Sequence, residues 1–283
     1  MMHIKERFFY PSNRDIYFDN IKGKLILLVV LGHLLEFNLS CFLFRFAYVF
    51  LYSFVMPAFV FVSGIFFSPK LKNITKIFVI YFFSQLSLFL LRSKIEYLHL
   101  NTFLTPIWTL WYLLCLFYWY CGYVFLEKHQ FSKLSILVFA LVLSLLCGFF
   151  KIGYFLSLQR AFSFFFFFAL GVYVNKEHLK NTIKKLKNWK ICLSCIVGLF
   201  VLYLILDENF FPRAFYNSFS YYYFFPYSKW NMLGVRSLQF ILSFIFGIFL
   251  LKNTSHNKSF YTWCGYYSLW IYLIHTFILY YLK

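Results

Sequence analysis

The sequence has few charged residues for its length. Only 13% of the 283 residues are Asp, Glu, Lys or Arg, whereas 62% are hydrophobic; soluble domains carry about 25% charged residues. A chain of this size cannot hide so much apolar surface in a soluble core, which excludes a soluble globular domain. Among the charged residues, Asp and Glu number 9 against 27 Lys and Arg, so the net charge is +18. In so apolar a chain this charge is typical of cytoplasmic loops, so we expect no nucleic-acid partner.

The cysteines do not follow the pattern of a disulfide framework or a metal site. There are 7 of them, an odd number, and most lie inside apolar runs. Cys192 and Cys195 have a C-x-x-C spacing, but no second pair of ligands follows. We interpret them as small apolar side chains, and we expect no metal site.

Apolar stretches of about 17–25 residues dominate the chain, and they lack the strict alternation of strands. They predict an all-α fold, a polytopic bundle of about nine transmembrane helices. The expected spans are residues 21–37, 46–67, 74–91, 106–126, 133–150, 156–174, 190–206, 233–251 and 260–281.

The basic residues predict that the N-terminus is cytoplasmic, because this orientation puts about twice as many of them inside as outside. The Lys-rich residues 175–190 then form a cytoplasmic amphipathic connector near anionic lipid. The aromatic residues 207–230 lie outside, either as an interfacial belt or as a lid that stacks on sugar rings.

Ionisable residues inside a span are costly, so each is a functional candidate. His33 and Glu36 lie three residues apart and therefore share a helix face. A carboxylate beside an imidazole orients the ring and raises its basicity, as a general base requires. The alternative is a polar pair that only holds helices together.

Five further polar or aromatic residues are expected at two depths. Lys22, with Asp19 beside it, precedes His33 by eleven residues, about 16 Å along a helix, and so lies near the cytoplasmic face. Trp111, Arg160 and His275 are expected at the depth of His33 and Glu36. Convergence at one level predicts one water-accessible cavity. For Pro57, Ser63 and Gly64 the preferred interpretation is helix packing.

Five segments form a pattern along the chain: residues 14–33, 54–64, 108–114, 159–171 and 265–275. Together they resemble the membrane acyltransferase-3 family, the group containing the fucose 4-O-acetylase-like proteins. Members usually have ten spans, so the expected count is nine to ten, in the cell membrane, bacterial inner or plasma. The first segment contains Arg14, Asp19, Lys22, Gly23 and His33 in the family's spacing. The chain departs from the family at Val55, where members often have His, at Phe166 for Pro and at Tyr267 for Asn. Val55 argues against a two-histidine relay through this position.

The resemblance implies a single acyltransferase domain over residues 1–283. It would transfer an acyl group, usually acetyl, from cytoplasmic acyl-CoA to a hydroxyl of a surface polysaccharide or its lipid-linked precursor. His33 and Glu36 would be catalytic, and Asp19, Lys22, Trp111, Arg160 and His275 would bind acyl-CoA or acceptor. No cofactor is expected to be bound, since acetyl-CoA is the donor substrate. The alternatives are a transporter or flippase for a lipid-linked glycan, and a non-catalytic sensor or scaffold.

Overall fold

The computed structural model describes residues 14–93, 103–185, 189–205 and 210–282, and within these ranges all regular structure is helical, as predicted. The α-helices are α2 (Ile16–Leu35), α3 (Phe42–Ile65), α4 (Leu71–Ser93), α6 (Trp111–Lys128), α7 (Lys133–Leu146), α8 (Leu158–Tyr173), α9 (Lys176–Lys185), α10 (Trp189–Ile205), α11 (Phe210–Phe215), α12 (Lys229–Lys252), α13 (Phe260–Tyr266) and α14 (Ser268–Leu282). Short 3-10 turns are η1 (Glu36–Asn38), η2 (Trp108–Leu110), η3 (Cys147–Phe149), η4 (Phe155–Ser157) and η5 (Tyr221–Phe224).

The expected count of nine to ten spans is not confirmed. In the described part of the chain, five helices are long and apolar enough to cross a membrane. A sixth results if α9 and α10, which meet at 85°, form one broken span. Two predicted spans are too short: α7 has 14 residues, and the predicted span 260–281 is divided at Tyr267 into α13 and α14. For these two spans the apolar run overestimated the length of continuous helix. The predicted span 21–37 falls on α2, which has 20 residues but is not among the five apolar helices.

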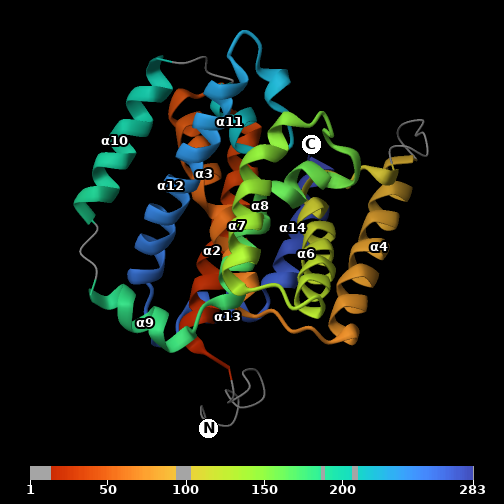
Figure 1. Cartoon of the computed structure of the whole chain (residues 1–283). Coiled ribbons are helices and arrows are strands. Elements are labelled where there is room, and N and C mark those ends of the chain that lie inside the picture. The colour runs from red at the N-terminus through yellow and green to blue at the C-terminus, as the bar shows by residue number, and fades with distance from the viewer. Residues whose placement is uncertain (1–13, 94–102, 186–188, 206–209, 283) are drawn as a thin grey trace.

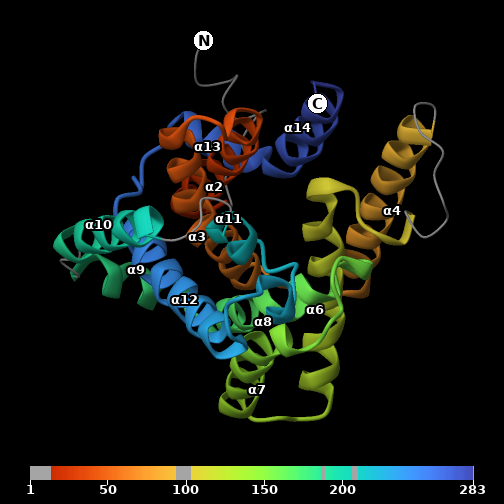
Figure 2. The same cartoon turned by 90° about the horizontal axis from the view of Figure 1, so that it is seen from above.

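The helices form one bundle with α2 and α3 near its centre and α4 and α10 at its periphery (Figures 1 and 2). Helix α2 begins at one end of the bundle and rises beside α3, α13 and α14 to the other. Asp15 accepts hydrogen bonds from the backbone N–H groups of Tyr17 and Phe18, which caps the start of α2. Lys22 and His33 therefore lie toward opposite ends of the same central helix.

Two pairs of glycines let neighbouring helices touch through their backbones. A Cβ on Gly64 of α3 would lie 2.2 Å from the Phe168 carbonyl oxygen of α8, and one on Gly171 would lie 2.1 Å from that of Phe61. Gly23 of α2 and Gly265 of α13 have the same reciprocal relation. The prediction that Gly64 permits close helix approach is confirmed.

Asn20 ties α2 to the segment around α13. Its Nδ2 donates to the carbonyl oxygens of Ser255 and Asn257, both at 2.8 Å. Its Oδ1 accepts from the hydroxyls of Ser259 and Thr262 at 2.9 and 2.6 Å. Because the amide is almost fully buried and both ends are satisfied, it stabilises this helix pair without leaving an unpaired polar group.

Replacing Gly64 by Val should separate α3 from α8. The added side chain meets backbone, which cannot rotate away, so we expect a loss of about 2–3 kcal/mol of stability. The readout is the apparent melting temperature of the purified protein in detergent. Gly122→Val on α6 is the matched control, since a Cβ there meets nothing within 4 Å. Equal melting temperatures for the two variants would contradict this packing.

Candidate active site

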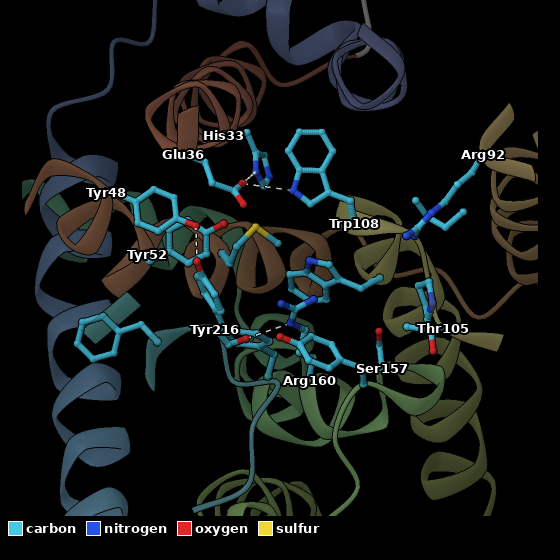
Figure 3. Close-up of a pocket in the computed structure, with 17 residues that line it drawn as sticks. His33, Glu36, Tyr48, Tyr52, Arg92, Thr105, Trp108, Ser157, Arg160 and Tyr216 are labelled. Atoms are coloured by element: carbon cyan, nitrogen blue, oxygen red, sulfur yellow. Dashed lines mark hydrogen bonds and ion pairs between the residues drawn. The ribbon is translucent and has the colours of Figure 1, made fainter. Parts of the chain in front are cut away.

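A cavity of about 310 Å³ lies at the end of the bundle where α2 finishes, and we call it the His33 cavity (Figure 3). Its walls come from α2, α3, α6, α8 and the segment after α11. The lining residues are His33, Glu36, Tyr48, Tyr52, Met56, Arg92, Thr105, Pro106, Ile107, Trp108, Trp111, Tyr154, Ser157, Arg160, Phe164, Phe215 and Tyr216.

His33 and Glu36 form a pair at the mouth of this cavity. Helix α2 ends at Leu35 and continues as a 3-10 turn, so the two side chains stay on one face. Nδ1 of His33 lies 3.5 Å from Oε2 of Glu36. The indole N–H of Trp108 donates to the same oxygen at 3.3 Å, and its ring packs edge-on against the imidazole. A proton on Nδ1 would face the carboxylate, which leaves Nε2 of His33 as the basic nitrogen.

His275 of α14 packs behind His33 and does not line the cavity. The imidazole rings stack with their centroids 5.6 Å apart and their planes 28° apart. Nδ1 of His275 lies 3.0 Å from the Ile271 carbonyl oxygen, while its buried Nε2 has no hydrogen-bond partner among the described residues. Val55 is buried in α3 and carries no polar group. The second imidazole near His33 therefore comes from α14.

Arg160 projects into the His33 cavity from the first turn of α8. Its Nε donates to the Tyr216 carbonyl oxygen at 3.1 Å. The guanidinium carbon lies 4.7 Å from the centre of the Trp111 ring and 5.9 Å from that of Tyr154. One hydrogen bond and two aromatic faces thus orient a planar fork of donors at the depth of His33.

Three tyrosines complete the wall opposite Trp108, and the sequence interpretation did not single them out. The hydroxyls of Tyr48 and Tyr216 share a hydrogen bond of 2.8 Å, and the ring of Tyr52 lies against that of Tyr48. The i, i+4 spacing of Tyr48 and Tyr52 could have revealed them. Tyr216 belongs to the aromatic segment 207–230, of which 207–209 lie outside the described residues. The role of that segment as a sugar lid stays a prediction.

A second cavity of about 300 Å³, the Lys22 cavity, lies toward the other end of α2. Arg14 and Lys22 both line it, and Arg14 donates to the two carboxylate oxygens of Asp19 at 2.9 and 2.7 Å. Nζ of Lys22 lies 3.8 Å from Asp19 and 3.6 Å from the centre of the Phe66 ring. Lys176 of α9 approaches the same ring to 4.1 Å. Asp19 is a buried anion between cations and does not reach the His33 cavity.

Buried hydroxyl groups form hydrogen bonds among α3, η2, α6 and α14. The hydroxyls of Ser63 and Tyr112 lie 2.6 Å apart at the Lys22 cavity. Farther along, Thr109 and Thr276 share a 2.5 Å hydrogen bond, and Tyr272 donates to the Thr109 carbonyl oxygen. Ser63, Tyr112 and Tyr272 line the Lys22 cavity, whereas Thr109 and Thr276 line neither cavity.

The comparisons with known proteins give one match. A family model described as an acyltransferase domain, that of the acyltransferase-3 family, matches residues 15–283. No curated protein matches the chain, and no solved structure matches it. Within the described ranges, no group of three His, Cys, Asp or Glu residues could hold a metal ion.

The two cavities should be accessible from opposite sides of the membrane. Thr105→Cys reports on the His33 cavity and Ser268→Cys on the Lys22 cavity, each in a background with Cys41, Cys121 and Cys195 replaced by Ser. A membrane-impermeant maleimide should label one in intact cells and the other only in inverted vesicles, because eleven residues of helix separate the two levels. The background protein without an added cysteine is the control. Labelling of both from the same side would contradict this arrangement.

Proposed function

The chain belongs to the acyltransferase-3 family and is a membrane acyltransferase, and from this premise we propose that it transfers an acetyl or similar acyl group from cytoplasmic acyl-CoA to a hydroxyl of a cell-surface polysaccharide or its lipid-linked precursor. The observation that carries the proposal is the His33–Glu36 pair at the edge of a cavity that also holds Arg160. A base with an orienting carboxylate can activate a hydroxyl for acyl transfer, and a nearby cation can stabilise the developing oxyanion.

In the proposed reaction, Nε2 of His33 removes the proton of the acceptor hydroxyl. The hydroxyl oxygen attacks the thioester carbonyl, a C–O bond forms, and the C–S bond breaks. The imidazolium then returns its proton to the departing thiolate of CoA. A variant in which His33 carries the acyl group transiently uses the same atoms, since Nε2 would itself attack the thioester. In both, Glu36 holds the ring by Nδ1 and stabilises its positive charge.

The walls of the His33 cavity suit a carbohydrate acceptor. Trp108, Tyr52 and Tyr216 are partly exposed and offer aromatic surface, which packs well on sugar rings, while Tyr48 and Trp111 are buried in the wall behind them. The guanidinium of Arg160 offers N–H donors beside these rings, where it would bind the acceptor or the developing oxyanion. His275 supports the position of the His33 ring from behind.

The Lys22 cavity suits the nucleotide part of the donor. Its basic residues, with Lys176 beside them, would attract the phosphates of acyl-CoA, and the proposed cytoplasmic N-terminus faces the compartment where acyl-CoA is made. To reach His33, the acyl group would have to pass the buried hydroxyl pairs Ser63–Tyr112 and Thr109–Thr276. Donor and acceptor then enter from opposite ends of α2, in keeping with a reaction across the membrane.

His33→Gln should abolish most of the transfer while keeping the side chain's bulk. General-base catalysis contributes about 10²–10⁴-fold, so we expect at least a hundredfold loss of acetyl ester on the glycan, measured by mass spectrometry. His129→Gln is the matched control, because His129 is exposed at the end of α6. Near-normal acetylation at normal protein level would remove His33 from catalysis. If the variant instead lost the glycan from the cell surface while the mass of the glycan stayed the same, the result would indicate a flippase.

Lys22 and Arg160 should respond differently to conservative exchange. Lys22→Ala should raise the apparent KM for acyl-CoA about tenfold, whereas Lys22→Arg keeps the charge and should retain most activity. Arg160→Lys should lower turnover more strongly, because an ammonium cannot reproduce a planar fork that stacks on Trp111. Donor KM, turnover and protein level are measured in membranes. Equal effects of Lys22→Ala and Lys22→Arg would show that Lys22 is outside the donor site.

A further inference from the structure

A third cavity, which we call the α8–α12 crevice, has a different character from the first two. It measures about 210 Å³ and is bounded by α2, α3, α8 and α12, with Leu179 of α9 at one end. Its lining is aliphatic or aromatic apart from Ser243. The Ser243 hydroxyl donates its proton within the protein, where the carbonyl oxygens of Ser53 and Gln239 both lie 2.7 Å from Oγ. The crevice therefore offers a ligand no free side-chain hydrogen-bond donor.

Small residues create the space in this crevice. A Cβ added to Gly247 of α12 would meet only the methyl group of Ala58 on α3, at 4.0 Å. Pro57 of α3 and Leu25 of α2 line the same space. Phe244, also in the lining, is more than one third exposed, so the crevice reaches the outer surface of the bundle. In a membrane this surface faces lipid chains.

The occupant of such a space has to be apolar. Water would lack hydrogen-bond partners there, and an empty crevice would forfeit dispersion contacts on every side. A methylene chain restores these contacts without desolvating any polar group. Since a lipid tail is already in an apolar solvent, tail burial alone gives little preference for one lipid. Selectivity must therefore come from charge at the end of the crevice.

The end of the crevice near α9 is basic. Leu179 and Leu251 line it, and each is followed in the chain by a lysine, Lys180 and Lys252. Lys180 is engaged by Asp15 at 2.8 Å and Glu177 at 3.0 Å. On the last turn of α9, Lys184 and Lys185 are exposed, and within the described residues no carboxylate pairs with either. α9 thus presents positive charge where a lipid headgroup would lie.

We propose that the α8–α12 crevice binds one acyl chain of an anionic phospholipid, whose headgroup contacts the lysines at the ends of α9 and α12. The crevice shares Val62 with the Lys22 cavity and no lining residue with the His33 cavity. The site is therefore a lipid site in its own right and does not depend on the proposed acyl transfer. Its ligand class is a phosphatidylglycerol-like lipid, selected by negative charge and held by one tail.

A photoreactive lipid tests the proposal on the unmodified chain. Phosphatidylglycerol with a diazirine in the middle of one tail is bound to the purified protein, irradiated, and the modified peptides are mapped by mass spectrometry. Label should fall on residues 57–62 of α3 and 243–251 of α12, and unlabelled phosphatidylglycerol should displace it better than phosphatidylcholine. Label confined to peripheral helices such as α4 and α10, or equal displacement by both lipids, would overturn the proposal. So would displacement by long-chain acyl-CoA but not by phosphatidylglycerol.

Two variants separate the tail from the headgroup. Gly247→Leu fills the crevice and should reduce its label to background, whereas Gly234→Leu, on an exposed face of the same helix, should keep it. Lys184→Gln with Lys185→Gln should weaken phosphatidylglycerol binding by about fivefold or more and leave phosphatidylcholine binding unchanged. Full labelling of Gly247→Leu would refute the tail site. If that variant does not accumulate, the peptide map of the unmodified chain decides.

Discussion

The backbone contact of α3 with α8, and of α2 with α13, determines where the site residues lie. At Gly64 and Gly171, and again at Gly23 and Gly265, a single added carbon would overlap a carbonyl group or its neighbours. Lipid gives helices no hydrophobic reason to associate, so close packing of this kind must supply much of the attraction. Because α8 carries Arg160 and α2 carries both Lys22 and His33, a small separation of either pair would alter both cavities.

Charge in the bundle is tolerated because each ionised group has partners at short range. Asp19 is held by Arg14 and Lys22. Arg236, buried in α12, is satisfied without a described carboxylate: it reaches the Ser144 carbonyl oxygen, the Cys147 thiol and the face of Tyr221. An ionised group that would be costly alone in lipid is stabilised by these partners, and the same contacts fix the orientation of its side chain.

The three cavities described above differ in the chemistry of their linings. The His33 cavity combines a base, a cation and aromatic faces; the Lys22 cavity combines cations with hydroxyls; the α8–α12 crevice is apolar. The first two lie toward opposite ends of α2 and share no lining residue. Helix α9 contributes to two of these environments, since Lys176 approaches the Lys22 cavity and Leu179 closes the crevice.

The sequence by itself determined the helical class, the family and the local geometry along α2. His33 and Glu36 adjoin because they are three residues apart, and Lys22 lies at another level because a helix rises 1.5 Å per residue. It did not give the span count, since hydropathy does not report where Tyr267 divides a helix or how short α7 is. Only tertiary structure brought Trp108 onto Glu36, 72 residues away, and His275 onto His33. Those contacts depend on the angles at which the helices cross. Where a helix is apolar all round, its sequence shows no apolar stripe from which the packing face and the crossing angle could be predicted.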